Sequence, residues 1–285
     1  MRLLRFFAGD GSLHLGVRDG DEVLDLGHRS PLEVRPPAQL PVSGRVPAKG
    51  LRLDAPIREV PKLLALAGNY RKHIEESGFS VPEQGVLTPQ IFWKPSTAIN
   101  APGGSIALRE NNVFLDWEVE LAVVIGRRTS RVAAANAMGC VFGYTVVNDI
   151  SERKFNSRLD NRNKREFDPF FDWLNGKWFD GSAPLGPAIV TADEIGDPHD
   201  LPIRLWLNGE LMQDSNTRHM IFRIPETIAA ASAVLTLEPG DVIAMGTPDG
   251  VGMARGRALR PGDHLRAEIE GIGALETRIT GEASA

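Results

Sequence analysis

The hydrophobic pattern is clearest between residues 115 and 126. Acidic and apolar residues alternate in the first half of this stretch, and the second half is continuously apolar. Such a pattern predicts a β-strand that begins beside a cavity and then becomes buried on both faces. Because alternate residues of a strand share a face, Asp116, Glu118 and Glu120 should project together.

These three carboxylates have two interpretations. Carboxylates that lie side by side repel one another unless water screens them or a cation neutralises them. The apolar run that follows argues against full solvation, which favours a hard divalent cation held by oxygen ligands. The alternative is an exposed acidic edge without an ion, and this strand alone leaves the two about equal.

Other segments of alternating or apolar residues, bounded by Gly, Pro, Asn and Asp, predict strands along the whole chain. Residues 31–60 are rich in proline, so we place a boundary near Pro61 between a small N-terminal β cap (1–60) and a main domain (61–285). Strands outnumber helices, which predicts a β-rich α+β fold. The predicted strands are 3–7, 13–17, 22–26, 62–67, 91–95, 141–147, a hairpin around 205–212, 263–269 and 274–279; the predicted helices are 133–138, 225–237 and a short one that Asn69 caps and Gly78 ends.

Composition and charge exclude several classes of protein. The chain has 285 residues, 42% hydrophobic and 24% charged, with a net charge of -5, as is ordinary for a soluble globular protein. No block of Lys or Arg marks a nucleic-acid surface, and no apolar run approaches the roughly 18 residues that span a bilayer. The lone Cys140 excludes an internal disulfide and is expected to be a buried thiol rather than a nucleophile. We expect a cytoplasmic protein without membrane or nucleic-acid partners.

Four further positions carry candidate chemistry. His73 and Glu76 are three residues apart on the short helix and therefore share a face, which suits a general base with its orienting carboxylate but also an ordinary surface pair. Asp149 follows the apolar strand 141–147, and strand ends often build sites. Lys177 is flanked by glycine and aromatic residues, which predicts partial desolvation.

Taken in order, the motifs of this chain resemble the fumarylacetoacetate hydrolase family. Each motif is weak alone, and the specificity comes from their number and order over residues 60 to 280. The matching motifs are Gly68-Asn69-Tyr70 with His73 and Glu76, Phe92-Trp93-Lys94-Pro95-Ser96-Thr97-Ala98, Trp117-Glu118-Val119-Glu120-Leu121, Gly143-Tyr144, Asn148-Asp149, Gly176-Lys177 with Asp180, Pro184-Leu185-Gly186-Pro187, Asn208-Gly209-Glu210 and Gly246-Thr247-Pro248-Asp249-Gly250-Val251-Gly252.

The resemblance implies a mixed β-roll catalytic domain, usually a homodimer, with a bound Mg²⁺ (Mn²⁺ or Ca²⁺ are alternatives). It implies Glu118, Glu120 and Asp149 as ligands of the cation, whereas Asp116 is not a usual ligand. It implies His73 with Glu76 as the water-activating pair and Lys177 as the group that stabilises an oxyanion. The residues expected to contact the substrate are Tyr70, Lys94, Arg153, Asn156 and Thr247.

The implied reaction is the metal-dependent hydrolysis of a C–C bond in a 2,4-dioxo acid, such as an acylpyruvate or fumarylacetoacetate, through an enolate held by the metal. The first alternative is an oxaloacetate decarboxylase, or an isomerase or tautomerase of unsaturated dioxo acids (hydroxymuconate or heptadienedioate type), using the same metal site. The presence of both His73 and Glu76 favours hydrolysis, because tautomerisation needs no activated water. A non-catalytic protein with a structural Ca²⁺ is a third possibility, but it requires neither His73 nor Lys177.

Two departures from the family pattern fall where the distal end of the substrate should lie. Residues 152–156 lack the family's glutamine, and the segment 156–177 is longer than usual. We also expect residues 79–89, rich in helix breakers, to form a flap behind the helix that carries His73. We expect residues Arg153 to Trp173 to close the distal side of the pocket. One of their arginines is expected to meet a second anionic group of the substrate, or else all of them pair with surface acids; the arginines are Arg153, Arg158, Arg162 and Arg165, and the acids are Asp160, Glu166 and Asp168.

Overall fold

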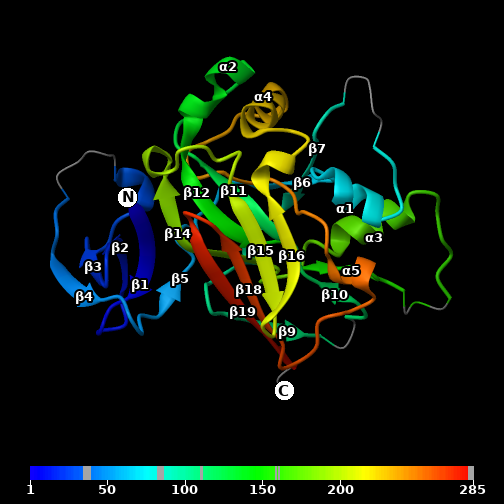
Figure 1. Ribbon diagram of the computed structural model, residues 1–285, viewed down its shortest axis with the longest axis horizontal. Helices are drawn as coiled ribbons and strands as arrows, with labels where there is room; N and C mark the ends of the chain where they lie inside the picture. The colour runs from blue at the N-terminus through cyan, green and yellow to red at the C-terminus, as the bar shows by residue number, and fades with distance from the viewer. Residues whose placement is uncertain (35–39, 82–86, 110–111, 158, 160, 282–285) are drawn as a thin grey trace.

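The computed structural model describes residues 1–34, 40–81, 87–109, 112–157, 159 and 161–281. Strands dominate, as the sequence predicts, and helices lie mainly at the periphery (Figure 1). The N-terminal strands occupy one side of the molecule, and α1 and α3 occupy the opposite side (Figure 1). The fold is therefore the β-rich α+β class that the hydrophobic pattern indicates.

A sheet of twelve strands runs through the molecule. Its order is β4-β3-β2-β1-β14-β12-β11-β17-β6-β7, with β5 paired to β1 and β8 paired to β14. The N-terminal strands continue this sheet, because β1 pairs with β14; the division of the chain near Pro61 stays a prediction. The strands are β1 (Arg2–Phe7), β2 (Leu13–Asp19), β3 (Glu22–Asp25), β4 (Gly44–Pro47), β5 (Leu53–Asp54), β6 (Leu63–Ala67), β7 (Gln90–Lys94), β8 (Ile99–Asn100), β11 (Val119–Ile125), β12 (Val141–Asn148), β14 (Ala183–Thr191) and β17 (Val242–Ala244).

A second sheet packs on the middle of the first one. It has five strands in the order β16-β15-β18-β19-β9. Odd-numbered side chains of β11, such as Leu121 and Val123, join a core cluster with Leu205 of this second sheet. Even-numbered ones, such as Ala122, join another cluster with Leu3. Burial on both faces explains the continuous apolar run in β11. The five strands are β9 (Ser105–Leu108), β15 (Pro202–Leu207), β16 (Glu210–Asn216), β18 (His264–Ile269) and β19 (Gly273–Gly281).

The helices are short and cover the edges of the sheets. The predicted helices 133–138 and 225–237 are confirmed as α2 and α4, which pack against each other. None of the helices in the described ranges is long and apolar enough to cross a membrane. The helices are α1 (Arg71–Glu76), α2 (Ala134–Ala137), α3 (Asp168–Asn175), α4 (Ile224–Val234) and α5 (Gly252–Arg255).

The hairpin between β15 and β16 is confirmed. Its turn residues Asn208 and Gly209 have φ values of 53° and 84°. Positive φ at both central positions is the requirement of the type I′ turn, which fits the twist of the two strands. The Asn-Gly pair therefore fixes this connection locally.

The prediction of one continuous strand over 115–126 is wrong. The stretch forms β10 (Leu115–Asp116), which pairs with β13 (Ser151–Glu152), and the separate β11, which pairs with β12 and β17. The break follows from Asp116, whose carboxylate accepts hydrogen bonds from the backbone N–H groups of Gly252 and Met253 at 2.6 and 3.0 Å. Asp116 thus holds the start of α5 and does not line one face with the glutamates.

The prediction that Asn69 caps the short helix is also wrong. The residue at the N-terminus of α1 is Tyr70, and no side chain caps the helix there. The Asn69 amide instead donates to the carbonyls of Phe222 and Met245, at 3.1 and 2.7 Å. A long-range anchor therefore replaces the expected local cap. The flap expected over 79–89 lies partly outside the described residues.

Candidate active site

The structure brings three of the predicted carboxylates together. Glu118 directly precedes β11, Glu120 is the second residue of β11, and Asp149 directly follows β12. One oxygen atom of each lies within 4.8 Å of the others, and all three side chains are buried. Antiparallel pairing of Val119 with Asn148 sets this arrangement, and the Asp149 N–H donates to the Glu118 carbonyl at 2.9 Å. The central sheet therefore fixes the backbone under the cluster.

Further hydrogen bonds orient the glutamates. The Glu118 N–H donates to the Asn148 side-chain oxygen at 2.9 Å. The Gly246 N–H donates to Glu120 Oε2 at 2.7 Å. A glutamate that accepts a backbone N–H has fewer orientations to lose when it binds a cation.

Gln213 of β16 supports the same strand, although the sequence interpretation missed it. It is fully buried; its Oε1 accepts from the Val119 N–H at 3.1 Å, and its Nε2 donates to Thr247 Oγ1 at 2.9 Å and to the Pro248 carbonyl at 2.8 Å. The Thr247 hydroxyl in turn donates to the Val119 carbonyl at 3.0 Å. Thr247, expected to contact the substrate, thus uses its proton to hold the strand between the two glutamates.

Three cationic side chains surround the cluster. Lys177 Nζ lies 2.6 Å from Glu118 Oε2 and 2.8 Å from Asp149 Oδ2. Lys94 Nζ lies 2.6 Å from Asp149 Oδ1 and also donates to the Lys177 carbonyl. Both lysines are buried, which confirms the expected desolvation of Lys177.

Arg153 is the third cation. Its Nη2 lies 2.5 Å from Glu118 Oε1, and its Nε lies 2.8 Å from Asp116 Oδ2. The guanidinium thus bridges a carboxylate of the cluster and the carboxylate that holds α5. The structure places it at the cluster, and contact with the substrate stays a prediction.

The electrostatics of the cluster differ between its members. Burial, and then the charges of Asp149 and Glu118, raise the pKa of Glu120 well above its ordinary value. Burial also acts to raise the pKa of Glu118, but Arg153 and Lys177 outweigh it and lower that pKa to about 2. Burial acts to lower the pKa of Lys177, but Asp149 and Glu118 raise it overall. Glu120 therefore carries the unrelieved repulsion that a bound dication would neutralise.

His73 and Glu76 face this cluster from α1. His73 Nδ1 lies 2.8 Å from Glu76 Oε1, and the other oxygen of Glu76 accepts from the Gly250 N–H at 2.8 Å. A protonated His73 would lower the pKa of Glu118, so the imidazole lies within electrostatic range of the cluster. With Nδ1–H directed at Glu76, Nε2 is left as an acceptor, which is the arrangement of a general base.

Two residues expected to contact the substrate, Tyr70 and Asn156, have different surroundings. Tyr70 is buried; burial and the charge of Glu120 raise the pKa of its phenol, and its hydroxyl has no hydrogen-bond partner among the described residues. It is therefore a donor placed near the cluster. Asn156, in contrast, has a positive φ of 61° and donates to Asp172 of α3 at 2.9 Å. The structure connects Asn156 to that helix and records no bond from it to the cluster.

Two arginines of the longer segment pair with acidic side chains of α3. Arg162 lies 3.1 Å from Asp168 and 2.5 Å from Asp172, and Arg165 lies 3.0 Å from Asp168. These pairs match the surface-pairing alternative. Arg158 lies outside the described residues.

Aromatic rings lie beside Lys177, from the segment that the sequence places near the distal end of the substrate and from β7. The Phe92 ring centroid lies 5.7 Å from Lys177 Nζ, and the Trp173 ring meets Phe92 edge-on at 5.0 Å between centroids. The signal in the sequence was the aromatic run that precedes Lys177, but nothing in the sequence shows that it packs on β7.

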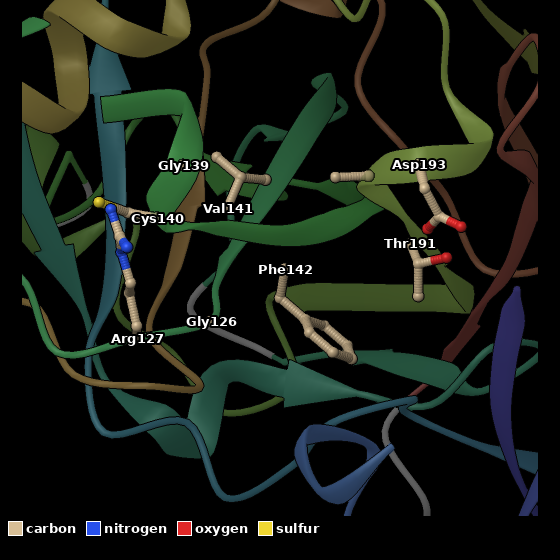
Figure 2. A pocket seen from close by; sticks show the side chains of 9 residues that line it. Gly126, Arg127, Gly139, Cys140, Val141, Phe142, Thr191 and Asp193 are labelled. Carbon is tan, nitrogen blue, oxygen red and sulfur yellow. The ribbon is translucent and has the colours of Figure 1, made fainter. Parts of the chain in front are cut away.

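A separate pocket of about 400 Å³ lies at the beginning of β12. Figure 2 shows Cys140 and Arg127 on one side of it and Thr191 and Asp193 on the other. Cys140 is a buried free thiol, as expected. None of the charged residues of the cluster lines this pocket, so the chemistry concentrates at the cluster.

Comparison with known proteins agrees with this geometry. Residues 62–280 match the family described as fumarylacetoacetate (FAA) hydrolase C-terminal. Oxaloacetate tautomerase Fahd2a, mitochondrial, of Rattus norvegicus is 40% identical over 244 residues, which is 85% of this chain and 72% of the relative.

Two solved structures show the same fold. The 5-carboxymethyl-2-hydroxymuconate delta-isomerase from Mycobacterium smegmatis has a TM-score of 0.78 and 34% identity, covering 100% of both chains. Maleylpyruvate hydrolase from Sphingobium sp. SYK-6, in complex with manganese (II) ion and pyruvate, has a TM-score of 0.74 and 31% identity, covering 99% of this chain and 100% of that one. The chain belongs to the fumarylacetoacetate hydrolase family of enzymes.

Proposed function

We propose that the protein hydrolyses a C–C bond in a 2,4-dioxo acid and depends on a divalent cation. The observation that carries this proposal is the His73–Glu76 pair, hydrogen-bonded at 2.8 Å and within electrostatic range of the buried carboxylate cluster. A base held beside a cation site is what the activation of a water molecule requires.

The cluster fits a divalent cation. Glu118, Glu120 and Asp149 offer oxygen atoms within 4.8 Å of one another, and oxygen is the ligand that Mg²⁺, Mn²⁺ and Ca²⁺ prefer. The raised pKa of Glu120 shows repulsion that such a cation would relieve. When bound, the cation would supply Lewis-acid polarisation of the 1-carboxylate and 2-oxo group of the substrate and orient them.

The residues of the chain then divide the work. His73 Nε2 accepts a proton from water, and Glu76 stabilises the imidazolium that results. The hydroxide oxygen forms a bond to the distal carbonyl carbon, and Lys177 offsets the negative charge that develops on the carbonyl oxygen. The bond between this carbon and C3 breaks, its electron pair forms an enolate, and the imidazolium returns the proton to C3. Two carboxylic acids are released.

Keto–enol tautomerisation of a 2-oxo acid such as oxaloacetate is the second candidate. The observation that favours it is the 40% identity to the rat relative of that name. In this reaction His73 would move one proton between carbon and oxygen, and no water would be added. The two reactions share the cluster and the base, and they differ in their products.

One experiment separates the two candidates. The purified protein is given acetylpyruvate or oxaloacetate with Mg²⁺, Mn²⁺, Ca²⁺ or EDTA, while the enol absorbance is followed and the products are identified. Hydrolysis predicts pyruvate and acetate from acetylpyruvate, and no turnover in EDTA. Faster enol loss from oxaloacetate without cleavage of acetylpyruvate would support the tautomerase instead.

Two expectations from the sequence remain proposals. We propose a homodimer, which light scattering of the purified protein would test. We also propose a cytoplasmic location, which fractionation of the source cells would test.

A further inference from the structure

We propose that a row of three aromatic rings beside the carboxylate cluster binds an apolar distal group of the substrate. The row consists of Phe92 of β7 with Trp173 and Phe170 of α3. The preferred acid would then carry an aryl or alkyl group at its distal end rather than a second carboxylate. This inference rests on the proposed function, because that function places the 2-oxo acid end of the substrate at the cluster.

The row begins at the cluster itself. Phe92 and Lys94 are two residues apart on β7, so their side chains share one face of the sheet. Lys94 Nζ lies 2.6 Å from Asp149, and Lys177 Nζ lies 5.7 Å from the Phe92 ring centroid and 2.6 Å from Glu118. One contact, with Lys177, and the shared strand face with Lys94 thus place the Phe92 ring next to the site.

The row then continues outward along α3. Trp173 meets Phe92 at 5.0 Å with an interplanar angle of 68°, and Phe170 meets Trp173 at 5.9 Å and 33°. Phe170 and Trp173 are three residues apart, so they lie on one face of the helix. Phe170 is 55% exposed. Apolar ring surface that is left in water beside a site gains free energy when an apolar ligand group covers it.

The described arginines of the longer segment are already paired with acidic side chains, so neither is an unpaired partner for a second carboxylate. Arg162 and Arg165 are held by Asp168 and Asp172 at 2.5–3.1 Å. The cations at the cluster itself also have carboxylate partners, as their distances show. They are Lys94, Arg153 and Lys177.

The charge balance points the same way. With the His73–Glu76 pair left aside, four carboxylates, those of Asp116, Glu118, Glu120 and Asp149, stand against the three cations. One dication and one substrate carboxylate bring this set to neutrality. A second substrate carboxylate would add an uncompensated charge in a buried region, which costs free energy. Oxaloacetate carries such a group, so the inference separates this chain from the rat relative.

Two inert mimics of a 2-oxo acid test the inference. N-benzyloxamate and N-oxalylglycine share the oxamate end and differ only in carrying a phenyl or a carboxylate group on the same methylene. Calorimetric binding to the Mg²⁺-loaded protein should favour N-benzyloxamate by about tenfold or more, which is about 1.4 kcal/mol. Trp173→Ala should weaken N-benzyloxamate by about tenfold and leave N-oxalylglycine unchanged.

Matched variants complete the test. Phe170→Ala changes a half-exposed ring, so it keeps the experiment decisive if Trp173→Ala does not fold; Trp173→Phe should retain the preference. Phe167→Ala, an exposed ring at the start of α3 outside the row, should bind both mimics like the wild type. Equal or tighter binding of N-oxalylglycine, or equal weakening of both mimics by Trp173→Ala, would overturn the inference. Oxalate binding separates failure of this inference from failure of the proposed function. If oxalate binds in such a case, only the inference about the aromatic row is contradicted. If oxalate does not bind, the proposed function is contradicted as well.

Discussion

The carboxylate cluster and helix α1, which carries His73 and Glu76, are built in different ways. The cluster lies on β11 and β12, two interior strands of the large sheet, and the side chains of Glu118, Glu120 and Asp149 are almost inaccessible to solvent. Helix α1 has six residues, none of them buried, and no side chain caps its start. The cluster is therefore shaped by the core, whereas α1 depends on a few contacts at its ends.

This difference suits the two tasks of the site, which are to hold a cation and to place a base beside the substrate. Isolated helices of this length are marginal in water, so α1 needs its anchors, the Asn69 amide and the Glu76–Gly250 hydrogen bond. Ligands of a cation must be preorganised, and here β-sheet pairing supplies that order. A base that must approach and leave the substrate is better placed on an element with few contacts.

The largest expected effect comes from removing the base. His73→Asn should lower kcat by about 10²–10⁴-fold, the range of general acid–base catalysis, because no other described side chain replaces its free nitrogen. Cation binding, measured by calorimetry, should stay unchanged because His73 is not one of the clustered carboxylates. His219→Asn, a change at an exposed histidine, is the control. A kcat close to that of the wild type would remove His73 from the mechanism.

A change in the cluster should produce the next largest effect. Glu120→Gln should weaken Mg²⁺ binding by more than about 100-fold, beyond the range seen for groups that only orient ligands. Without the cation, the same variant should melt at a higher temperature than the wild type, because it removes a carboxyl whose charge is disfavoured by burial and then by Asp149 and Glu118. Unchanged Mg²⁺ affinity would place the cation elsewhere.

Gln213 tests whether the support beneath the cluster matters. Gln213→Leu keeps the side chain buried but removes its bonds to Val119, Thr247 and Pro248. Mg²⁺ affinity should fall by about 10–100-fold, the usual cost of losing an orienting partner. Hydrogen exchange in α1 should not change. The opposite result, tight Mg²⁺ binding with a loosened α1, would assign Gln213 to the helix instead.

Ligand binding should affect the two regions differently. Hydrogen exchange of residues 71–76 should slow when oxalate and Mg²⁺ bind, whereas residues 119–125 should already be protected without them. Mass spectrometry of peptides from the two regions measures this contrast. Equal protection of α1 with and without oxalate would contradict the expectation that this helix becomes ordered over the bound acid.

The smallest effect is expected at Arg162. Its partners are Asp168 and Asp172, so Arg162→Ala should change kcat/KM by less than about twofold for both acetylpyruvate and oxaloacetate. A selective loss with oxaloacetate would show that this arginine binds a second carboxylate, and it would revive the hypothesis formed from the sequence.

The sequence predicts most of what local patterns determine. The two-residue spacing placed Glu118 and Glu120 on one face of a strand, together with Asp116, and the resemblance to the family added Asp149 to the two glutamates. The Asn-Gly pair was enough to place a hairpin. In each of these cases the deciding interaction lies within a strand, a turn or the pairing of strands.

Long-range hydrogen bonds account for what the sequence could not predict. Asp116 does not share a face with the glutamates as expected, because its carboxylate accepts from backbone N–H groups of α5, more than a hundred residues away. Asn69 does not cap α1 locally, because its amide donates to the carbonyls of Phe222 and Met245. Nothing in the sequence distinguishes Gln213 from other polar residues near the predicted hairpin. Its hydrogen bond to Val119 exists only because the second sheet packs on β11.

Gly250 joins the two regions through one residue. Its N–H donates to the carboxylate of Glu76 in α1. Its carbonyl accepts at 3.2 Å from Nε1 of Trp117, which is the residue directly before Glu118. With φ at 99° and a Cβ position only 2.2 Å from the Met212 carbonyl oxygen, no other residue fits there. A residue shared in this way offers one physical link between binding of the cation and binding of the acid. If closure of α1 over an organic acid tightens cation binding by some factor, the cation must tighten binding of the acid by that same factor.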